Sequence, residues 1–113
     1  MKIVYLNNVV RLAGNAYQKT HPELYKLMYF EFRKVKSMDW DDFDYYMNEE
    51  LAKGDSSKRI KRIGKEELYE FRLPPSAKNG VLRAEFTLDG DCYTICITRI
   101  YVKNHEPKQQ PKR

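Results

Sequence analysis

Two arginines, Arg72 and Arg83, occupy stretches of the sequence in which apolar and charged residues alternate. Residues 67–73 and 82–88 have the two-residue period of half-buried strands, so each stretch has one apolar and one charged face. By parity, both arginines can share the charged face, where they repel each other unless an anion lies between them. Guanidinium groups suit phosphate oxygens, although Glu70 and Glu85 could supply the negative charge through cross-strand ion pairs.

The turn after the second stretch predicts how a third strand pairs with it. Asp89-Gly90 supplies the positive φ angles of a two-residue type I′ hairpin. In that register Arg83 lies opposite Cys96 on the charged face. Arg99 falls by parity on the apolar side, so we expect a β-bulge or the end of the sheet near it.

The charge is unevenly distributed between the two halves of the chain. The net charge is +5, yet residues 1–57 carry 8 Lys/Arg and 9 Asp/Glu, and residues 58–113 carry 13 and 7. A positive surface attracts phosphate backbones, which makes nucleic acid the first partner to consider and an acidic protein segment the second. We expect a phosphate-contacting strip in the basic run of residues 58–65, although an ordinary exposed loop is the alternative. Its five cations are Lys58, Arg59, Lys61, Arg62 and Lys65.

Length and composition are those of a single soluble domain over residues 1–113, with 42% hydrophobic and 33% charged residues. No apolar run is long enough for a membrane helix, so a cytoplasmic protein without membrane contact is expected. Cys92 and Cys96 are roughly 13 Å apart along one extended strand, too far for a disulfide. They also lack zinc-like spacing, and no metal or cofactor is expected.

The first half of the chain predicts a short strand over residues 2–6, followed by helices. Asn7 or Asn8 can cap the first helix. Thr20-His21-Pro22-Glu23 has the spacing of a capping box for the second helix. The predicted apolar faces contain Val9, Leu12, Ala16 and Tyr17 in the first helix and Leu24, Met28, Phe32 and Val35, widened by Tyr25 and Tyr29, in the second.

A third helix is predicted to begin near Asp39, because aspartates are favourable at the positive end of a helix dipole, and to end near Gly54. A metal site is the alternative for these aspartates, but Asp39, Asp41 and Asp42 would splay around a helix rather than converge. The fold class is therefore α+β. An N-terminal strand and helices between residues 7 and 53 pack on one face of an antiparallel sheet built from residues 67–102. We expect residues 104–113 to be a mobile basic tail.

The order of short motifs in the second half, LYEFRLP, VLR and ICITRIYVKNHEPK, resembles RelE/HigB-type toxins of bacterial type II toxin–antitoxin pairs. The resemblance is to the phage-associated HigB-like branch, whose fold is RelE/ParE-like. It covers roughly the last half of the chain. The matching residues are Leu68, Tyr69, Glu70, Arg72, Leu82, Arg83, Ile95, Ile97, Val102, Lys103 and Pro107.

This resemblance implies an endoribonuclease that cleaves mRNA, commonly on the ribosome, and that a cognate antitoxin neutralises. Cleavage would proceed without metal, by attack of a ribose 2′-OH on the adjacent phosphate. Arg83 and Arg72 would hold the phosphate, while Lys103 and His105 would be the candidates for proton transfer. Two alternatives stay open: a non-catalytic, gyrase-inhibitor-like module that binds protein, and a phage or host RNA-binding protein whose tyrosines stack on bases.

Overall fold

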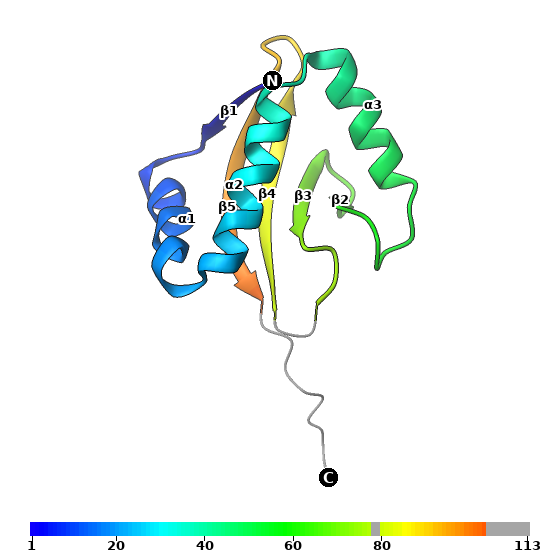
Figure 1. Ribbon diagram of the computed structural model, residues 1–113. Helices are drawn as coiled ribbons and strands as arrows, with labels where there is room; N and C mark the ends of the chain where they lie inside the picture. The colour runs from blue at the N-terminus through cyan, green and yellow to red at the C-terminus, as the bar shows by residue number, and fades with distance from the viewer. Residues whose placement is uncertain (78–79, 104–113) are drawn as a thin grey trace.

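The computed structural model describes residues 1–77 and 80–103, and in these ranges it confirms the predicted α+β class (Figure 1). No helix in them is both long and apolar enough to cross a membrane. The elements, in chain order, are β1 (Lys2–Tyr5), α1 (Asn8–Thr20), α2 (Pro22–Lys36), α3 (Trp40–Leu51), β2 (Ile60–Ile63), β3 (Leu68–Leu73), β4 (Val81–Asp89) and β5 (Thr94–Lys103).

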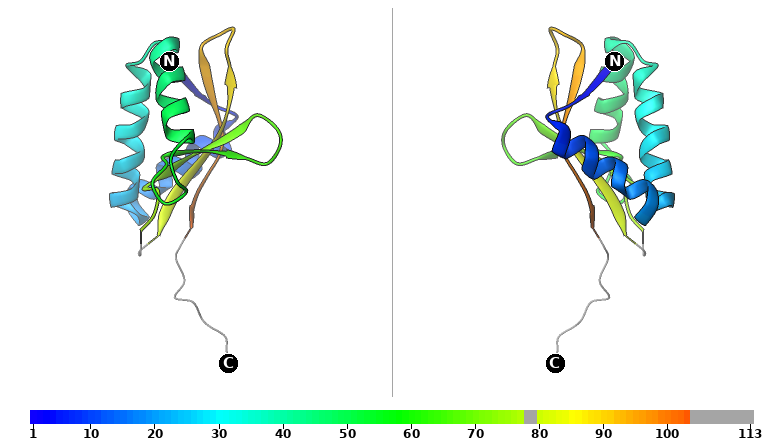
Figure 2. Two further views of the ribbon diagram at one scale, coloured as in Figure 1. Left: turned by 90° about the vertical axis from the view of Figure 1, so that its right-hand side faces the viewer. Right: turned by 90° about the vertical axis from the view of Figure 1, so that its left-hand side faces the viewer.

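The five strands form one sheet in the order β1-β5-β4-β3-β2. β1 runs parallel to β5, and every other neighbouring pair is antiparallel. The helices lie on one side of this sheet (Figure 2), as the sequence predicts. Between helices and sheet lies the core, in which Phe71 and Phe86 are fully buried with ring centroids 4.5 Å apart. Each buried phenylalanine contributes about 2–3 kcal/mol, so the central strands form a firm base for the side chains on their other face.

The sequence does not predict strand β2, because the basic run that contains it has the composition of an exposed loop. Ile60 is fully buried and pairs with Phe71 of β3. The strand has only four residues, and two of them are cations. Alternation over so short a stretch is a weak signal, and the burial of Ile60 depends on β3 and α3, which the local sequence does not specify.

The predicted register between β4 and β5 is wrong. Asp89 pairs with Thr94, so the connection contains four residues instead of two. The carboxylate of Asp89 accepts hydrogen bonds from the backbone N–H groups of Asp91 and Cys92, which stabilises this longer turn. The bulge expected near Arg99 is present, since the pairing shifts by one residue between Glu85 and Phe86.

Helix α1 buries a different face from the one predicted, except at Tyr17, which packs against the core as predicted. Asn7 caps it by accepting a hydrogen bond from the Val10 N–H. Val10 and Gly14 face the core, whereas Val9 and Leu12 are 75% and 56% exposed. A Cβ atom at Gly14 would lie 2.8 Å from Ile100 Cδ1, so glycine permits the close approach of α1 to β5.

The starts of α2 and α3 confirm one predicted cap and overturn another. Thr20 is the last residue of α1, and His21 is the N-cap of α2 without a side-chain hydrogen bond, so the predicted capping box is wrong. Asp39 caps α3, accepting from the Asp42 N–H at 2.8 Å. Helix α3 ends before the predicted Gly54, with Ala52 as its C-cap.

The predicted core stripe of α2 is confirmed at Met28, Phe32 and Val35, which are buried, and at Leu24, which packs against the core. Tyr25 also packs against the core and widens the stripe as predicted, whereas Tyr29 is half exposed and does not. One position that the apolar pattern did not include, Glu31, is buried among these residues. Its partners come from α2 itself and from α3.

Candidate nucleic-acid interface

The face of the sheet without helices carries a compact group of polar side chains from its central strands. Pairing between β3, β4 and β5 arranges them in two rows, each of which crosses the three strands. We name this group the polar sheet patch. Its rows are Glu70, Glu85 and Arg99, and Arg72, Arg83 and Tyr101.

Arg83 lies at the centre of the second row, and it is buried although it belongs to the charged face that the sequence predicts. It is 6% exposed, and its guanidinium donates to the backbone oxygens of Pro74 at 3.1 Å and Pro75 at 3.4 Å. Burial lowers the pKa of Arg83, the nearby charge of Arg72 lowers it further, and Glu70 opposes both. Arg83 therefore holds the segment after β3 against the sheet.

The predicted adjacency of the two arginines is confirmed, because Arg72 pairs directly with Arg83 across β3 and β4. Glu70 lies between them, with its Oε2 atom 3.5 Å from Arg72 Nε and 3.9 Å from Arg83 Nε. Arg72 also donates to the backbone oxygen of Asp55 at 2.5 Å. The repulsion between the two cations is thus offset within the protein, as the cross-strand ion-pair interpretation requires.

Arg99 and Tyr101 form the accessible part of the polar sheet patch on β5. Arg99 is an exposed residue whose guanidinium carbon lies 4.2 Å from the centre of the Tyr101 ring. Its Nη1 atom is 3.5 Å from Glu85 Oε2. Burial raises the pKa of Tyr101, and the carboxylates of Glu70 and Glu85 raise it further. The phenol therefore keeps its proton at neutral pH and can act as a donor.

Sequence reasoning missed both Arg99 and Tyr101 as site residues. The reason is the bulge: Ile97 pairs with Phe86 and Arg99 with Glu85, so Thr98 is the extra residue. That single insertion moves Arg99 from the apolar side to the polar side. The alternation of Arg99, Tyr101 and Lys103 with Ile100 and Val102 was a signal that could have identified this face.

Of the two candidates for proton transfer, Lys103 lies within the described residues. It is the exposed last residue of β5, pairs with Val81, and shares the face of Tyr101 by strand alternation. His105 lies outside the described residues, as does the predicted basic tail of residues 104–113. Lys103 thus extends the positive charge of the polar sheet patch along its strand.

The five cations of the basic run do not form one strip, because β2 distributes them over two faces. Lys61 pairs with Glu70 and lies on the face of the polar sheet patch, and Lys65 lies in the exposed turn before β3. Arg62 lies on the other face, with its guanidinium carbon 6.0 Å from the Tyr69 ring centre.

The remaining two cations of the run precede β2 and contact the helix side. Lys58 donates from Nζ to the backbone oxygen of Leu51 at 3.0 Å, which ties this segment to the end of α3. Arg59 is exposed, and its backbone N–H donates to Glu50 at 2.8 Å. Only part of the basic run is therefore placed to extend the polar sheet patch.

The described residues show no arrangement suited to a metal ion. In residues 1–77 and 80–103, no group of three or more His, Cys, Asp or Glu side chains could hold one. Cys92 and Cys96 are free thiols. The polar sheet patch itself offers arginines, carboxylates and a tyrosine.

Comparisons with family models, with curated proteins and with solved structures give no match to this chain. The resemblance to RelE/HigB-type toxins consequently rests on the quoted sequence motifs, and its functional implications stay predictions.

Proposed function

We propose that the protein is a metal-independent endoribonuclease that binds RNA across the polar sheet patch. The observation that carries this proposal is the contact between the Arg99 guanidinium and the Tyr101 ring on β5. This contact sets an exposed cation beside a protonated phenol. Glu85, 3.5 Å from Arg99, adds a carboxylate to the same place. A cation, an acid and a base are the groups that RNA cleavage by internal attack requires.

In the proposed reaction the 2′-oxygen of a ribose attacks the adjacent phosphorus, and the bond from phosphorus to the 5′-oxygen breaks. Glu85 accepts the 2′ proton, and Tyr101 donates its proton to the departing 5′-oxygen. Arg99 stabilises the charge that develops on the phosphoryl oxygens. The products are a 2′,3′-cyclic phosphate and a 5′-hydroxyl, and the two residues exchange protons with solvent to complete the cycle.

The other cations of this face have supporting roles in the proposal. Lys103 extends positive charge to one side, and Lys61, whose Nζ lies 3.7 Å from the exposed Asp55 carboxylate, lies on the other, which favours a chain of phosphates over a single anion. Arg72 and Arg83, held by Glu70 and by backbone oxygens, fix the geometry of β3 and β4 under the substrate. This assignment replaces the direct phosphate contact that the sequence suggested for the two arginines.

The proposed substrate is mRNA, cleaved on the ribosome, with a cognate antitoxin as the neutralising partner. Support for these finer points comes from the resemblance to RelE/HigB-type toxins and from the basic second half of the chain. The proposed compartment is the cytoplasm, where the free thiols Cys92 and Cys96 would stay reduced.

The proposal is tested by incubating the purified protein with a synthetic RNA in the presence of EDTA. We expect fragments that end in a 2′,3′-cyclic phosphate. A matched RNA with a single 2′-deoxy nucleotide at the mapped cleavage position should stay intact at that position, because the attacking group is missing. Cleavage of the deoxy-substituted position, or fragments with other ends, would contradict the proposed reaction.

A further inference from the structure

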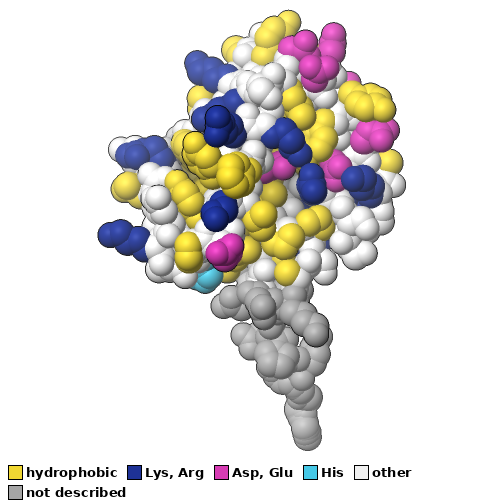
Figure 3. Space-filling model, viewed as in Figure 1, with side chains coloured by type: hydrophobic (Ala, Val, Ile, Leu, Met, Phe, Trp, Pro, Cys, Tyr) yellow, Lys and Arg dark blue, Asp and Glu magenta, His cyan; other side chains and the backbone are white. Residues whose placement is uncertain are grey.

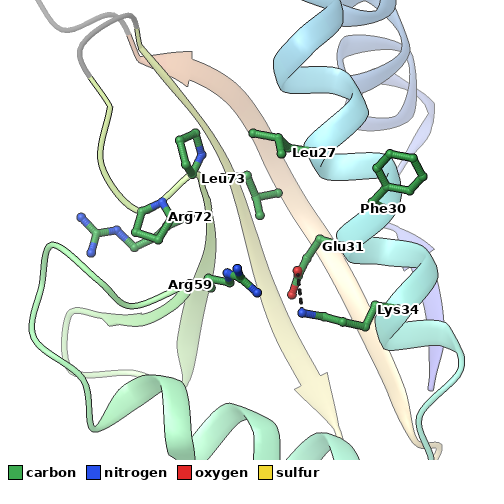
Figure 4. Close-up of a pocket in the computed structure, with 9 residues that line it drawn as sticks. Leu27, Phe30, Glu31, Lys34, Arg59, Arg72 and Leu73 are labelled. Atoms are coloured by element: carbon green, nitrogen blue, oxygen red, sulfur yellow. Dashed lines mark ion pairs between the residues drawn. The ribbon is translucent and has the colours of Figure 1, made fainter.

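A groove opens on the helix side of the molecule, between α2 and the end of β3 (Figure 4). Its volume is about 280 Å³. Leu27 and Phe30 of α2 form one apolar wall, and Leu73, Pro74 and Pro75 form the other. Phe30 is 55% exposed and Leu27 is 42% exposed, and a contiguous exposed apolar patch of this kind is typical of an interaction site.

The groove contains a buried carboxylate whose charge is already compensated. Glu31 is 6% exposed and accepts a hydrogen bond from the Tyr46 hydroxyl at 2.5 Å, while Lys34 Nζ lies 3.1 Å from its other oxygen. Burial raises the pKa of Tyr46, and Glu31 raises it further, so the phenol remains a donor. Glu31 therefore does not offer a free charge to a ligand.

Two cations reach the groove from opposite sides. Lys34 enters from α2, and Arg59 projects toward it from the segment before β2 (Figure 4). Within the described residues the Arg59 guanidinium forms no ion pair. Glu50, the nearby carboxylate, accepts from the Arg59 backbone N–H and pairs with Lys53. Lys34 balances Glu31, the single acidic residue among those that line the groove, so Arg59 gives the groove an uncompensated positive charge.

The apolar and basic character continues along the outer surface of α2. A shallow hollow of about 430 Å³ beside Phe30 is lined by Tyr25, Tyr29 and Lys26, among others. Figure 3 shows hydrophobic side chains gathered on this face and surrounded by lysines and arginines. Such a surface complements a chain that presents apolar residues on one side and carboxylates around them.

We propose that this groove binds an acidic amphipathic segment of a partner protein. Apolar side chains of the segment cover Leu27 and Phe30, and its carboxylates approach Lys34 and Arg59. A second copy of this chain is a poor occupant, because an α2 surface facing its own copy would bring like charges together. The apolar walls likewise suit a peptide better than a phosphate backbone.

The groove and the polar sheet patch are separate sites. Arg72 borders the groove, but its guanidinium points away from it toward the other face of the sheet (Figure 4). Leu73, the next residue, faces the helix side and is buried. Loss of binding in the groove can therefore be distinguished from loss of RNA cleavage, and the inference does not depend on the proposed ribonuclease activity.

The test is an NMR titration of the protein with a short synthetic peptide that has leucines at helical spacing and glutamates elsewhere. We expect the amide signals of α2 and of residues 72–75 to shift. Phe30→Ala and Arg59→Glu should each weaken binding about tenfold, as loss of a central anchor or reversal of a complementary charge does. Leu12→Ala is the matched control, because Leu12 is 56% exposed on α1 and lies outside the groove.

Five results would overturn the inference. Equal binding of a peptide in which lysines replace the glutamates would remove the charge argument. Absence of binding, or binding that both variants leave unchanged, would exclude the groove. Concentration-dependent shifts of the same signals without peptide would assign it to a second copy, and shifts on addition of RNA alone would assign it to nucleic acid.

Discussion

Tyr101→Phe is expected to bind RNA with the affinity of the wild type and to cleave it about a hundredfold more slowly. The substitution removes the phenolic proton but keeps the ring on which the Arg99 guanidinium lies at 4.2 Å. Burial and the two neighbouring carboxylates raise the pKa of Tyr101. At neutral pH the wild-type residue is thus fully protonated, and the variant loses a donor rather than a base.

The measurement is single-turnover cleavage at saturating protein, together with RNA binding by fluorescence anisotropy. Tyr93→Phe is the matched control, because Tyr93 is an exposed tyrosine in the turn before β5. It should cleave like the wild type. Wild-type cleavage by Tyr101→Phe would remove Tyr101 as the proton donor, and a parallel loss of affinity would make it a binding residue instead.

Arg83→Ala is expected to lower the free energy of unfolding by about 3 kcal/mol, because removing a buried charge that is both paired and hydrogen-bonded leaves its partners uncompensated. The backbone oxygens of Pro74 and Pro75 would lose their donor, and Glu70 would lose one of its two cations. An exposed arginine on a sheet would change stability by about 0.5 kcal/mol or less. The burial of Arg83 therefore predicts a much larger loss of stability than an exposed arginine on the same face would show.

Urea denaturation followed by circular dichroism measures this difference. Arg99→Ala supplies the comparison, since Arg99 is 62% exposed by its side chain and belongs to the same patch. It should unfold within about 0.5 kcal/mol of the wild type. Equal stability of the Arg83 and Arg99 variants would show that the contacts of Arg83 with Pro74 and Pro75 contribute little.

Much of the sheet could be predicted because alternation fixes which side chains share a face. Arg72 and Arg83 were placed side by side correctly from parity alone, and the pairing confirms it. The alternation of residues along a strand does not reveal, however, where an extra residue is inserted. The four-residue turn and the bulge at Thr98 both depend on how β5 pairs with β4, and together they moved Arg99 and Tyr101 into the site.

The helix side was harder to predict, because burial there depends on partners distant in sequence. Glu31 and Glu50 are charged residues that the apolar pattern leaves out of the core, yet both are buried. A carboxylate can be buried where donors compensate it. The hydroxyl of Tyr46 lies on another helix from Glu31, and Arg59 supplies a backbone N–H to Glu50 from the loop before β2.

Cleavage of RNA by Arg99→Gln, compared with Arg62→Gln, tests most directly whether the polar sheet patch carries the activity. Both residues are exposed arginines on strands of the same sheet, but they lie on opposite faces. We predict a loss of about a hundredfold for Arg99→Gln, the usual cost of removing one preorganised charge contact, and no loss for Arg62→Gln. Full cleavage by a folded Arg99→Gln protein would contradict the account.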